Sequence, residues 1–432
     1  MSMRVCVYGM WHLGCVTAAC LAEHFATTGC DPNEETVARL RQATPPISEP
    51  GLAELIAAGL SSGRLSFSID LARAVGSADV IWVTFDTPVN DDDVADVDAV
   101  RAHVEAIFPH LREGALVLMS SQVPVGFTAS LEQAFRSLYP GRRASFAYSP
   151  ENLRLGQALQ SFRQPQRIVG GVRNEEDRAI LAAVFAPFSQ NILWMDVESA
   201  EMTKHALNAF LATSVVFINE IAELCEQVGA DAKEVERGLK SEPRIGPKAY
   251  LGPGSAFAGG TLARDVAFLA QIGRREGVPT HLFSGVAASN NEHKAWPTRT
   301  LMRLLGDPRG KRIAILGLTY KPGTDTLRRS SAVELCLWLS SHGAEVRAYD
   351  PAVRRLPPEL SSLIRLCESS REALDAADAM VLATEWPTFK ELSADDVVNS
   401  MRTAVVLDPN RFLAPELARD RRVRYAAVGW PS

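Results

Sequence analysis

The sequence lacks most of the features that mark nucleic-acid-binding, membrane and secreted proteins. Its net charge is −6, and it has no block of Lys and Arg interleaved with aromatic residues, the pattern typical of nucleic-acid-binding surfaces. It contains no run of about eighteen apolar residues, the length that a membrane-spanning helix needs. Its N-terminus enters a strand pattern without the apolar region and cleavage site of a signal peptide. We therefore expect a cytoplasmic protein without a nucleic-acid or membrane partner.

Cysteine is scarce, and its spacing argues against disulfides and metal sites. The seven cysteines are odd in number, are scattered along the chain and never occur as C-x-x-C. A disulfide framework or a zinc site would need paired or clustered cysteines, so we expect reduced thiols and no metal. Most of them suit small buried core positions. The cysteines are Cys6, Cys15, Cys20, Cys30, Cys225, Cys336 and Cys367.

What the chain does contain is typical of a globular protein of two or three domains. Hydrophobic residues make up 47% and charged residues 22% of its 432 residues. In the first half, short apolar runs alternate with helix-like segments, a pattern that predicts a parallel, doubly wound sheet. The expected strands are RVCVYG, ADVIWVTF, ALVLMSS, SFAYSP and QRIVGG, and CVTAACLAEHFA is the expected helix after the first of them.

The pattern changes after Glu198, where apolar residues recur at helical spacing over about thirty positions. A second strand–turn pattern then begins at GDPRGKRIAILGLTY and continues through AEVRAYDP, DAMVLAT and TAVVLDP. We expect two Rossmann-like, doubly wound parallel-sheet domains of the α/β class, joined by a long central helix within a helical domain. The expected domains are 1–198, 199–305 and 306–432.

The long central helix has more apolar positions than one buried stripe needs. We therefore expect the chain to form a homodimer through the helix at 199–226. The alternative is a helix buried wholly inside one subunit.

The segment VCVYGMWHLGC, Val5 to Cys15, has the form of a dinucleotide-binding turn with one substitution. Gly9 permits the tight turn of a G-x-G-x-x-G motif, and Gly14 permits close packing of the helix on the strand. The middle glycine is replaced by Trp11, whose indole must turn away from a bound pyrophosphate or push it outward. Asp31 is placed to accept the ribose hydroxyls of NAD and to repel the 2′-phosphate of NADP. By itself, the motif fits NAD binding and an ordinary βα turn about equally well.

Further motifs extend along the whole chain. They are ISEPGL (47–52), FDTP (85–88), SSQVPVG (120–126), SPENLRLG (149–156), RIVGG (167–171), AEMTKHALNAFLA (200–212), FINEIAELCEQVGAD (217–231), EPRIG (242–246), YLGPGSAFAGGTLARD (250–265), ILGLTYKPGTDTLRRS (315–330), RAYDP (347–351) and ATEWPTF (383–389). In this order they resemble the UDP-glucose/GDP-mannose dehydrogenase family, the nucleotide-sugar dehydrogenases, from end to end. A dozen motifs in register are highly specific for that family.

The resemblance implies an oxidoreductase that takes a nucleotide-sugar alcohol to the carboxylate and passes two hydrides to NAD. It also implies an N-terminal NAD domain, a dimerising central helix and a C-terminal domain that holds the nucleotide sugar. By the same resemblance, we expect the cofactor to be bound by Gly9, Trp11, Leu13, Gly14, Asp31, Thr87, Gln122 and Arg328. The implied substrate-binding residues are Arg244, which reaches the substrate from the neighbouring subunit, together with Leu155, Lys321, Phe257 and Gly259.

The chemistry of the central segment fits this family. Lys204 and Asn208 are spaced i, i+4 and project from one helix face, where a cation and an amide can stabilise an alkoxide or oxyanion. The alternative is a solvated lysine and a polar helix residue. Asp265 follows a glycine-rich segment and is expected to orient a water or act as a base, although it also suits the first turn of a helix as an acidic residue. Glu151 matches the glutamate of the family's PE motif and completes the expected catalytic group with Thr261.

Four departures from the family pattern concern mainly the second half of the reaction. Thr261 stands where the family has its nucleophilic cysteine, whose thiol captures the aldehyde on the way to a thioester. A threonine hydroxyl is a far weaker nucleophile at neutral pH without a dedicated base. Leu155 replaces the second glutamate of the family's PEFLREG motif, Gln122 replaces the threonine of STVPVG, and Trp11 replaces a glycine.

Three readings therefore compete. In the first, the enzyme removes a hydride from a UDP- or GDP-hexose and stops at a carbonyl, or oxidises an aldehyde hydrate without an acyl-enzyme. In the second, the ordinary four-electron activity of a UDP-glucose 6-dehydrogenase survives and gives a uronate. The third is a non-catalytic protein that binds nucleotide sugars.

Overall fold

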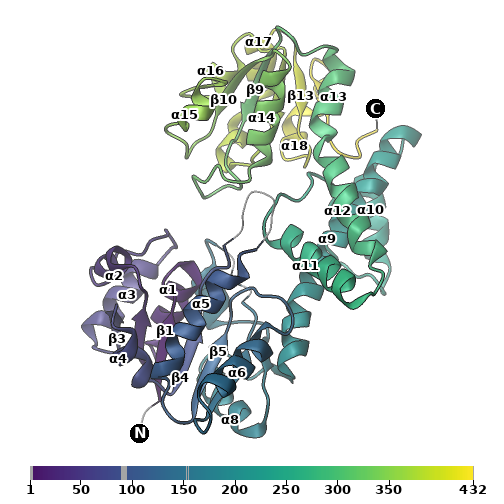
Figure 1. Cartoon of the computed structure of the whole chain (residues 1–432). Coiled ribbons are helices and arrows are strands. Elements are labelled where there is room, and N and C mark those ends of the chain that lie inside the picture. The colour runs from purple at the N-terminus through teal and green to yellow at the C-terminus, as the bar shows by residue number, and fades with distance from the viewer. Residues whose placement is uncertain (1–2, 89–94, 152, 154, 432) are drawn as a thin grey trace. The chain divides into compact units, whose positions relative to one another are not determined.

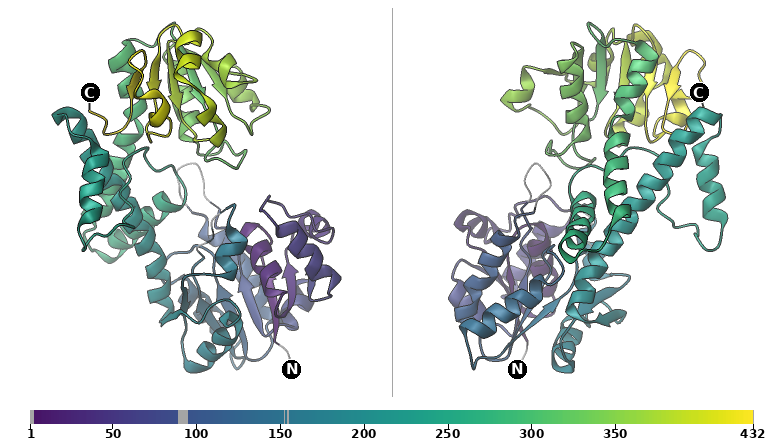
Figure 2. Two further views of the ribbon diagram at one scale, coloured as in Figure 1. Left: turned by 180° about the vertical axis from the view of Figure 1, so that it is seen from behind. Right: turned by 45° about the vertical axis from the view of Figure 1, so that its right-hand side comes forward.

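The computed structural model describes residues 3–88, 95–151, 153 and 155–431. The chain divides into two compact units, Met1–Ala206 and Leu207–Ser432. Each unit contains one sheet with helices packed around it (Figures 1 and 2).

The first unit is built on an eight-stranded sheet in the order β3-β2-β1-β4-β5-β6-β7-β8. Its first six strands run parallel in the 3-2-1-4-5-6 order of dinucleotide-binding domains, whereas β7 pairs antiparallel with β6. The strands are β1 Arg4–Tyr8, β2 Ala26–Cys30, β3 Leu65–Ser68, β4 Val80–Val83, β5 Ala115–Met119, β6 Ala144–Tyr148, β7 Ile168–Gly171 and β8 Ile192–Met195. The helices are α1 His12–Leu21, α2 Glu34–Leu40, α3 Leu52–Ser61, α4 Leu71–Gly76, α5 Val97–Ile107, the 3₁₀ turn η1 Phe108–His110, α6 Phe127–Leu138, α7 Ala158–Arg163 and α8 Glu175–Phe185.

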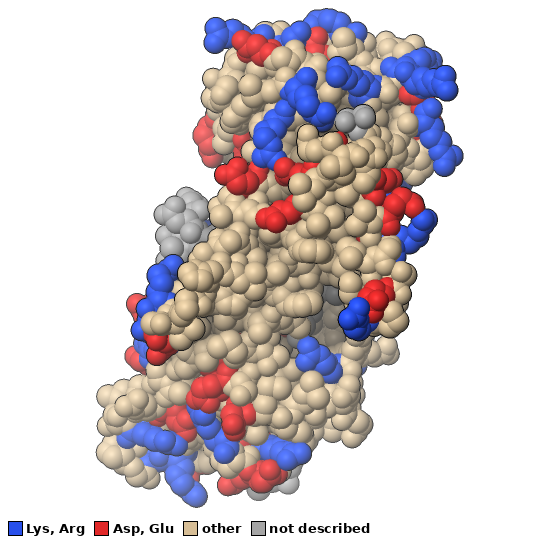
Figure 3. Space-filling model, turned by 90° about the vertical axis from the view of Figure 1, so that its right-hand side faces the viewer, with Lys and Arg blue, Asp and Glu red and all other residues tan. Residues whose placement is uncertain are grey.

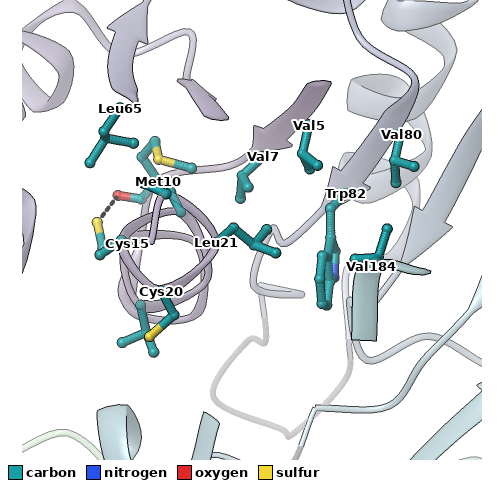
Figure 4. Packing of buried hydrophobic residues seen from close by; sticks show 14 of the residues in the cluster. Val5, Val7, Met10, Cys15, Cys20, Leu21, Leu65, Val80, Trp82 and Val184 are labelled. Carbon is teal, nitrogen blue, oxygen red and sulfur yellow. Dashed lines mark hydrogen bonds between the residues drawn. The ribbon is translucent and has the colours of Figure 1, made fainter. Parts of the chain in front are cut away.

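The central strands β1, β4 and β5 are buried on both faces, which explains why they are nearly continuous apolar runs. Alternate residues of β1 enter different cores: Val5 and Val7 pack on the side of α1, while Cys6 and Tyr8 pack on the opposite side. Figure 4 shows the first core, where Val7 and Met10 lie beside α1. This packing fixes the carboxyl end of β1, where the glycine turn begins.

The second unit begins within α9, Val197–Val228, and ends in a six-stranded sheet in the order β11-β10-β9-β12-β13-β14. All of its strands are parallel, again in a 3-2-1-4-5-6 order. The helices before the sheet are α10 Ala232–Ser241, α11 Thr261–Glu276, α12 His281–Lys294 and α13 Trp296–Leu305. The strands are β9 Arg312–Leu316, β10 Glu345–Tyr349, β11 Ile364–Leu366, β12 Ala379–Leu382, β13 Val405–Leu407 and β14 Arg424–Ala426. The remaining helices are α14 Ser331–Ser341, α15 Pro358–Ser361, α16 Ser370–Leu374, the 3₁₀ turn η2 Pro387–Glu391, α17 Ala394–Ser400 and α18 Ala414–Leu417.

The fold class predicted from the sequence is confirmed: two Rossmann-like sheets and a long central helix are present. Within the part of the chain that the structure describes, α9 is the one helix whose length and composition would allow it to cross a membrane, and 39% of its most apolar window is buried. On the face drawn in Figure 3, Lys and Arg side chains are interspersed with Asp and Glu. The three domain boundaries expected from the sequence remain a prediction.

Candidate active site

The glycine turn after β1 has the geometry that its two glycines predict. Gly9 has a φ of +104°, a conformation that favours glycine, and a Cβ there would lie 2.9 Å from the Phe85 ring. A Cβ on Gly14 would lie 1.8 Å from the carbonyl oxygen of Gly9, so only glycine lets α1 approach β1 this closely. The Cys15 thiol donates to the carbonyl oxygen of Met10 at 3.5 Å and ties the turn to the core (Figure 4).

Trp11 occupies the middle position of this turn without backbone strain. It is the N-cap residue of α1, with an extended conformation at φ −92°, and its side chain is 46% exposed. The glycine usual at this position is therefore not required by the backbone. A glycine there would serve only to leave room for a ligand.

Asp31 follows β2 directly and holds the glycine turn. Its Oδ2 accepts the backbone N–H of Met10 at 2.6 Å, and its Oδ1 accepts that of Asn33 at 2.9 Å. The residue is 9% exposed, so part of the carboxylate remains accessible beside the turn. This placement is compatible with a contact to ribose hydroxyls.

Other expected site residues follow the carboxyl ends of the same parallel strands, where ligands bind in open α/β sheets. Thr87 lies after β4 and donates through its hydroxyl to the carbonyl oxygen of Gln122 after β5, at 2.5 Å. Leu13, at the start of α1, lines a small cavity of about 100 Å³ that also contacts Glu151 after β6. The structure thus brings these four expected residues to one edge of the sheet.

Glu151 and Lys204 are paired within the first unit. The Lys204 ammonium, on α9 and 9% exposed, donates to the backbone carbonyl of Glu151. Burial raises the pKa of the Glu151 carboxyl, while the charges of Lys204 and His12 oppose the shift. Lys204 and Glu151 therefore meet beside the strand ends, and the catalytic roles that the resemblance implies for them stay a prediction.

Glu49 is a site residue that the sequence reasoning quoted but did not assign. Its buried carboxylate accepts the backbone N–H groups of Gly156 and Ala158, both at 2.8 Å, and lies 3.0 Å from His12 Nε2. It therefore connects the glycine turn to the segment that contains Leu155, which is half-buried. The ISEPGL motif could have identified Glu49 as a site residue, because this acidic residue lies in a segment that is neither helix nor strand.

Two further buried residues of α9 hold the segment after β5. Glu201 accepts the backbone N–H groups of Gly126 and Thr128, at 2.6 and 3.0 Å, and so caps the start of α6. His205 Nε2 lies 2.9 Å from the carbonyl oxygen of Val123. Sequence reasoning missed both because their partners lie more than seventy positions away.

In the second unit, Asn208 and Asp265 are hydrogen-bonded. The Asn208 amide on α9 donates to the Asp265 carboxylate on α11. The two residues are 6% and 0% exposed, respectively. The expectation that Asp265 could be a first-turn acid is wrong, because α11 begins at Thr261 and its first turn has no acidic residue. Asp265 lies one turn further along the helix.

Three adjacent segments of the chain match one family. Residues 3–189 match the NAD binding domain of the UDP-glucose/GDP-mannose dehydrogenase family, residues 198–292 its central domain and residues 314–415 its UDP binding domain. The chain belongs to the UDP-glucose/GDP-mannose dehydrogenase family.

Similar proteins agree along the full length. A UDP-glucose 6-dehydrogenase of Pseudomonas aeruginosa is 36% identical over 444 residues, covering 99% of this chain and 98% of that protein. One of Rhizobium meliloti is 34% identical over 437 residues, covering 99% and 100%. Among solved structures, a UDP-glucose dehydrogenase from Pyrobaculum islandicum superposes with a TM-score of 0.89 at 31% identity, covering 100% of this chain and 98% of that one.

This member of the UDP-glucose/GDP-mannose dehydrogenase family is an oxidoreductase, an NAD-dependent nucleotide-sugar dehydrogenase. The residues present fit NAD, because Gly9 permits the tight turn after β1 and Gly14 lets α1 pack closely against it. The N-terminus of α1 adds backbone N–H groups that suit a pyrophosphate. The substrate is a nucleotide sugar.

The remaining expected residues lie on loops of the second unit. Phe257 and Gly259 are half-buried in the loop before α11, and Thr261 is exposed at its start. Arg244 is exposed, with its side chain paired to Glu242 at 2.8 Å. The structure does not bring Arg244 to the other expected residues of its own unit.

The loop after β9 carries Lys321, expected at the substrate, and Arg328, expected at the cofactor. Lys321 is half-buried, and Arg328 is exposed near the start of α14. In the UDP binding domain of this family, cations on such a loop suit a diphosphate.

Proposed function

We propose that this enzyme oxidises a UDP- or GDP-hexose with NAD and stops at the carbonyl product after one two-electron step. The observation that carries the proposal is Thr261, the first residue of α11, in the position where the family has its nucleophilic thiol. A threonine hydroxyl is a far weaker nucleophile than a thiolate at neutral pH unless a dedicated base activates it.

The groups that support the first step are retained. Lys204 and Asn208 are one turn apart on α9 and are suited to stabilise the alkoxide that forms as the alcohol loses its proton. Asp265 orients the amide of Asn208 and is suited to receive a proton directly or through water. NAD, when bound, accepts the hydride. The raised pKa of Glu151 suits that carboxyl to hold a proton beside Lys204.

A thioester route through another cysteine is not supported. All seven cysteines are buried, and none of them lies between Cys30 and Cys225 or between Cys225 and Cys336. Burial raises the pKa of Cys15 to about 12 and that of Cys336 to about 12, so these thiols are almost wholly protonated at neutral pH. The second oxidation would therefore have to use an aldehyde hydrate without an acyl-enzyme.

A second candidate is the ordinary four-electron activity, which yields a uronate and two NADH. The observation that favours it is the name of the similar proteins from Pseudomonas aeruginosa and Rhizobium meliloti, UDP-glucose 6-dehydrogenase. In that case Thr261 occupies the position without a covalent role.

Counting NADH against product separates the two candidates. The enzyme is incubated with NAD and a panel of UDP- and GDP-hexoses, and the products are identified by mass spectrometry with hydroxylamine as a carbonyl trap. We expect at most one NADH per substrate and a trapped oxime. Two NADH and a uronate from the unmodified enzyme would contradict the one-step proposal. Thr261→Cys is expected to restore some acid formation, limited by Leu155 and Gln122.

We also propose a homodimer formed through α9. Apolar side chains of this helix recur at spacings of four, seven or eight residues and remain exposed: Met202 37%, Phe210 70%, Phe217 46%, Leu224 61% and Val228 76%. Such a stripe suits a second copy of the same helix. In this dimer, Arg244 would reach the substrate of the partner subunit. A monomer in sedimentation equilibrium at micromolar concentration would contradict it.

The expected domains, 1–198 for NAD, 199–305 for dimerisation and 306–432 for the nucleotide sugar, belong to the same proposal. The seven free, buried thiols support a cytoplasmic location, since reduced cysteines are typical of that compartment.

A further inference from the structure

The loop that carries Phe257 and Gly259 is held by side chains rather than by a backbone ladder. Residues 251–258 form neither helix nor strand, and a turn at 259–260 leads into α11. Such a segment keeps one conformation only if its backbone groups find other partners. We refer to residues 251–260 as the 251–260 loop.

Three asparagines supply part of these partners. Asn290 on α12 accepts the N–H of Phe257 at 3.0 Å and donates to its carbonyl oxygen at 2.9 Å. Asn219 on α9 accepts the N–H of Gly254 at 3.0 Å, and Asn410 accepts that of Ser255 at 2.7 Å. Side chains from three separate segments of the second unit therefore hold the loop.

His293 on α12 supplies a further contact and differs from the asparagines in being titratable. Its Nε2 lies 2.8 Å from the carbonyl oxygen of Gly254, and its Nδ1 lies 2.6 Å from Oε1 of Glu223 on α9. The residue is 5% exposed. A carbonyl oxygen only accepts, so the hydrogen bond to Gly254 requires a proton on Nε2.

Glu223, the other neighbour of the His293 ring, is also a hydrogen-bond acceptor. The hydrogen bond from His293 lowers the pKa of the Glu223 carboxyl, and the charge of Arg299, which lies 2.8 Å away, lowers it further against the effect of burial. Glu223 is therefore ionised at neutral pH, and its carboxylate requires a proton on Nδ1. Only the imidazolium form of His293 donates on both sides at once.

The charged groups around His293 are of both signs. From α9, Glu220, Glu223 and Glu226 line the groove beside it, and from α12 and α13, Glu292, Arg299 and Arg303 line the same groove. On its other side, Lys294 is paired with Glu334 at 4.0 Å. Among these groups, Glu223 is the one that contacts the ring directly, so it is the main support of the positive charge.

We propose that His293 is a positioning residue whose imidazolium holds the 251–260 loop for nucleotide-sugar binding, so that loss of its proton weakens substrate binding. The proposal rests on the assignment of Phe257 and Gly259 to the substrate. When the ring loses one proton, either the contact to Gly254 or the contact to Glu223 must break. A loop held by fewer contacts loses more conformational entropy when it binds its ligand, so it binds that ligand more weakly.

The direction of the pH effect follows from the contacts. Because the pKa of Glu223 is lowered from its ordinary value of 4.5, its contribution to stability is present above that value and is lost as the pH falls through the lowered pKa. Loss of the His293 proton acts from the alkaline side. The loop contacts are therefore complete in the intermediate range, and KM for the nucleotide sugar rises as the pH increases.

The first experiment measures KM and kcat for a UDP-hexose substrate of the enzyme as a function of pH. In the unmodified enzyme we expect KM to rise about tenfold as the pH increases, with kcat changed less than about twofold. His293→Gln keeps a donor amide that has no ionisable proton, and its KM is expected to lack this rise. His281→Gln, an exposed histidine at the start of the same helix, is the matched control and should behave like the unmodified enzyme. The same rise of KM in His293→Gln would overturn the proposal.

A second variant keeps the proposal testable if His293→Gln does not fold. Glu223→Gln removes the carboxylate that favours the imidazolium, and the rise of KM is expected to begin at lower pH. An unchanged midpoint would overturn the proposal.

Hydrogen exchange of the unliganded protein tests the contacts of the 251–260 loop independently of substrate binding. Protection of the amides of Gly254, Ser255 and Phe257 is expected to fall with rising pH beyond the intrinsic base catalysis of exchange, and to stay constant in His293→Gln. Loss of protection without a change in KM would show that the loop does not bind the substrate, which contradicts that site assignment. Constant protection in the unmodified protein would contradict the role of His293 itself.

Discussion

The two sheets of this enzyme begin with the same turn and then differ in how they continue. After β1, the N–H of Gly9 donates to Cys30 at 2.9 Å, and after β9, the N–H of Gly317 donates to Tyr349 at 2.8 Å. Both glycines have positive φ, +104° and +90°. In each case an aspartate that follows the neighbouring strand accepts the next N–H: Asp31 at 2.6 Å in the first sheet and Asp350 at 2.7 Å in the second.

The connections that follow these turns are different in length and charge. In the first unit α1 begins at His12, three positions after Gly9, and its N-terminus lies at the turn. In the second unit α14 begins only at Ser331, and the intervening loop carries Lys321 and Arg328.

The same scaffold thus offers a diphosphate two different kinds of partner. A short connection presents the N–H groups of a helix N-terminus, whereas a long one presents cationic side chains. The two sheets share one strand order, and we expect the connection after the first strand to determine the ligand at each edge: NAD at the short connection and the nucleotide sugar at the long one.

The largest effect is expected for Gly14→Ala. The new Cβ would overlap the carbonyl oxygen of Gly9, so α1 must move away from β1. We expect NAD affinity to fall about 100-fold or more and the free energy of unfolding to drop by about 3 kcal/mol. Calorimetric titration and thermal unfolding measure the two effects. Gly285→Ala on α12, where nothing lies within 4 Å, is the matched control and should change neither. Normal NAD binding by Gly14→Ala would remove the basis for calling this turn the cofactor site.

Lys321→Ala tests the second turn. Loss of a charge-assisted contact to a phosphate is expected to raise KM for the nucleotide sugar about tenfold or more, with little change in NAD affinity. Steady-state kinetics with each substrate varied in turn measure this difference. Arg355→Ala, an exposed cation of the same sheet domain, is the control. A larger effect on NAD than on the sugar would reverse the assignment of the two turns.

The paired substitutions Asp31→Asn and Asp350→Asn separate ligand binding from structure. Asp31 is 9% exposed, whereas Asp350 is 1% exposed and also binds Thr319 and the Trp386 indole N–H. We expect Asp31→Asn to reduce the preference for NAD over NADP about tenfold, because less negative charge faces the 2′-phosphate. Asp350→Asn is expected to cost about 2 kcal/mol of stability and to leave that preference unchanged. Equal titration curves for NAD and NADP in the unmodified enzyme would contradict the role of Asp31.

The smallest effect is expected for Trp11→Gly. Since Trp11 is exposed and its backbone is extended, the substitution should leave the fold intact. NAD affinity should be unchanged or a few-fold tighter, because the backbone of the turn becomes more accessible. Fluorescence or calorimetric titration of NAD checks this. A tenfold weakening would mean that the indole contacts the cofactor.

The sequence predicted the features of this fold that depend on local pattern. Short apolar runs identified the parallel strands, and Gly9 and Gly14 identified the turn, because their constraints act within a few residues. The reversal at β7 was not predicted, since a short apolar run does not specify its direction. Nor were Glu49 and Asn290 identified as anchors. Glu49 reaches Gly156 across 107 positions and Asn290 reaches Phe257 across 33, and periodicity contains no information on such partners.

The seven buried thiols have a consequence for how the enzyme tolerates oxidants and alkylating agents. With Thr261 at the start of α11 and no exposed cysteine along the chain, peroxide or iodoacetamide meets no accessible thiolate. At neutral pH, a thiol with a pKa of about 12 is ionised to a fraction on the order of 10⁻⁵. A relative that depends on a cysteine nucleophile loses activity when that sulfur is oxidised to a sulfinic acid. In this chain all seven cysteines are buried, so none of them offers an exposed sulfur to such damage.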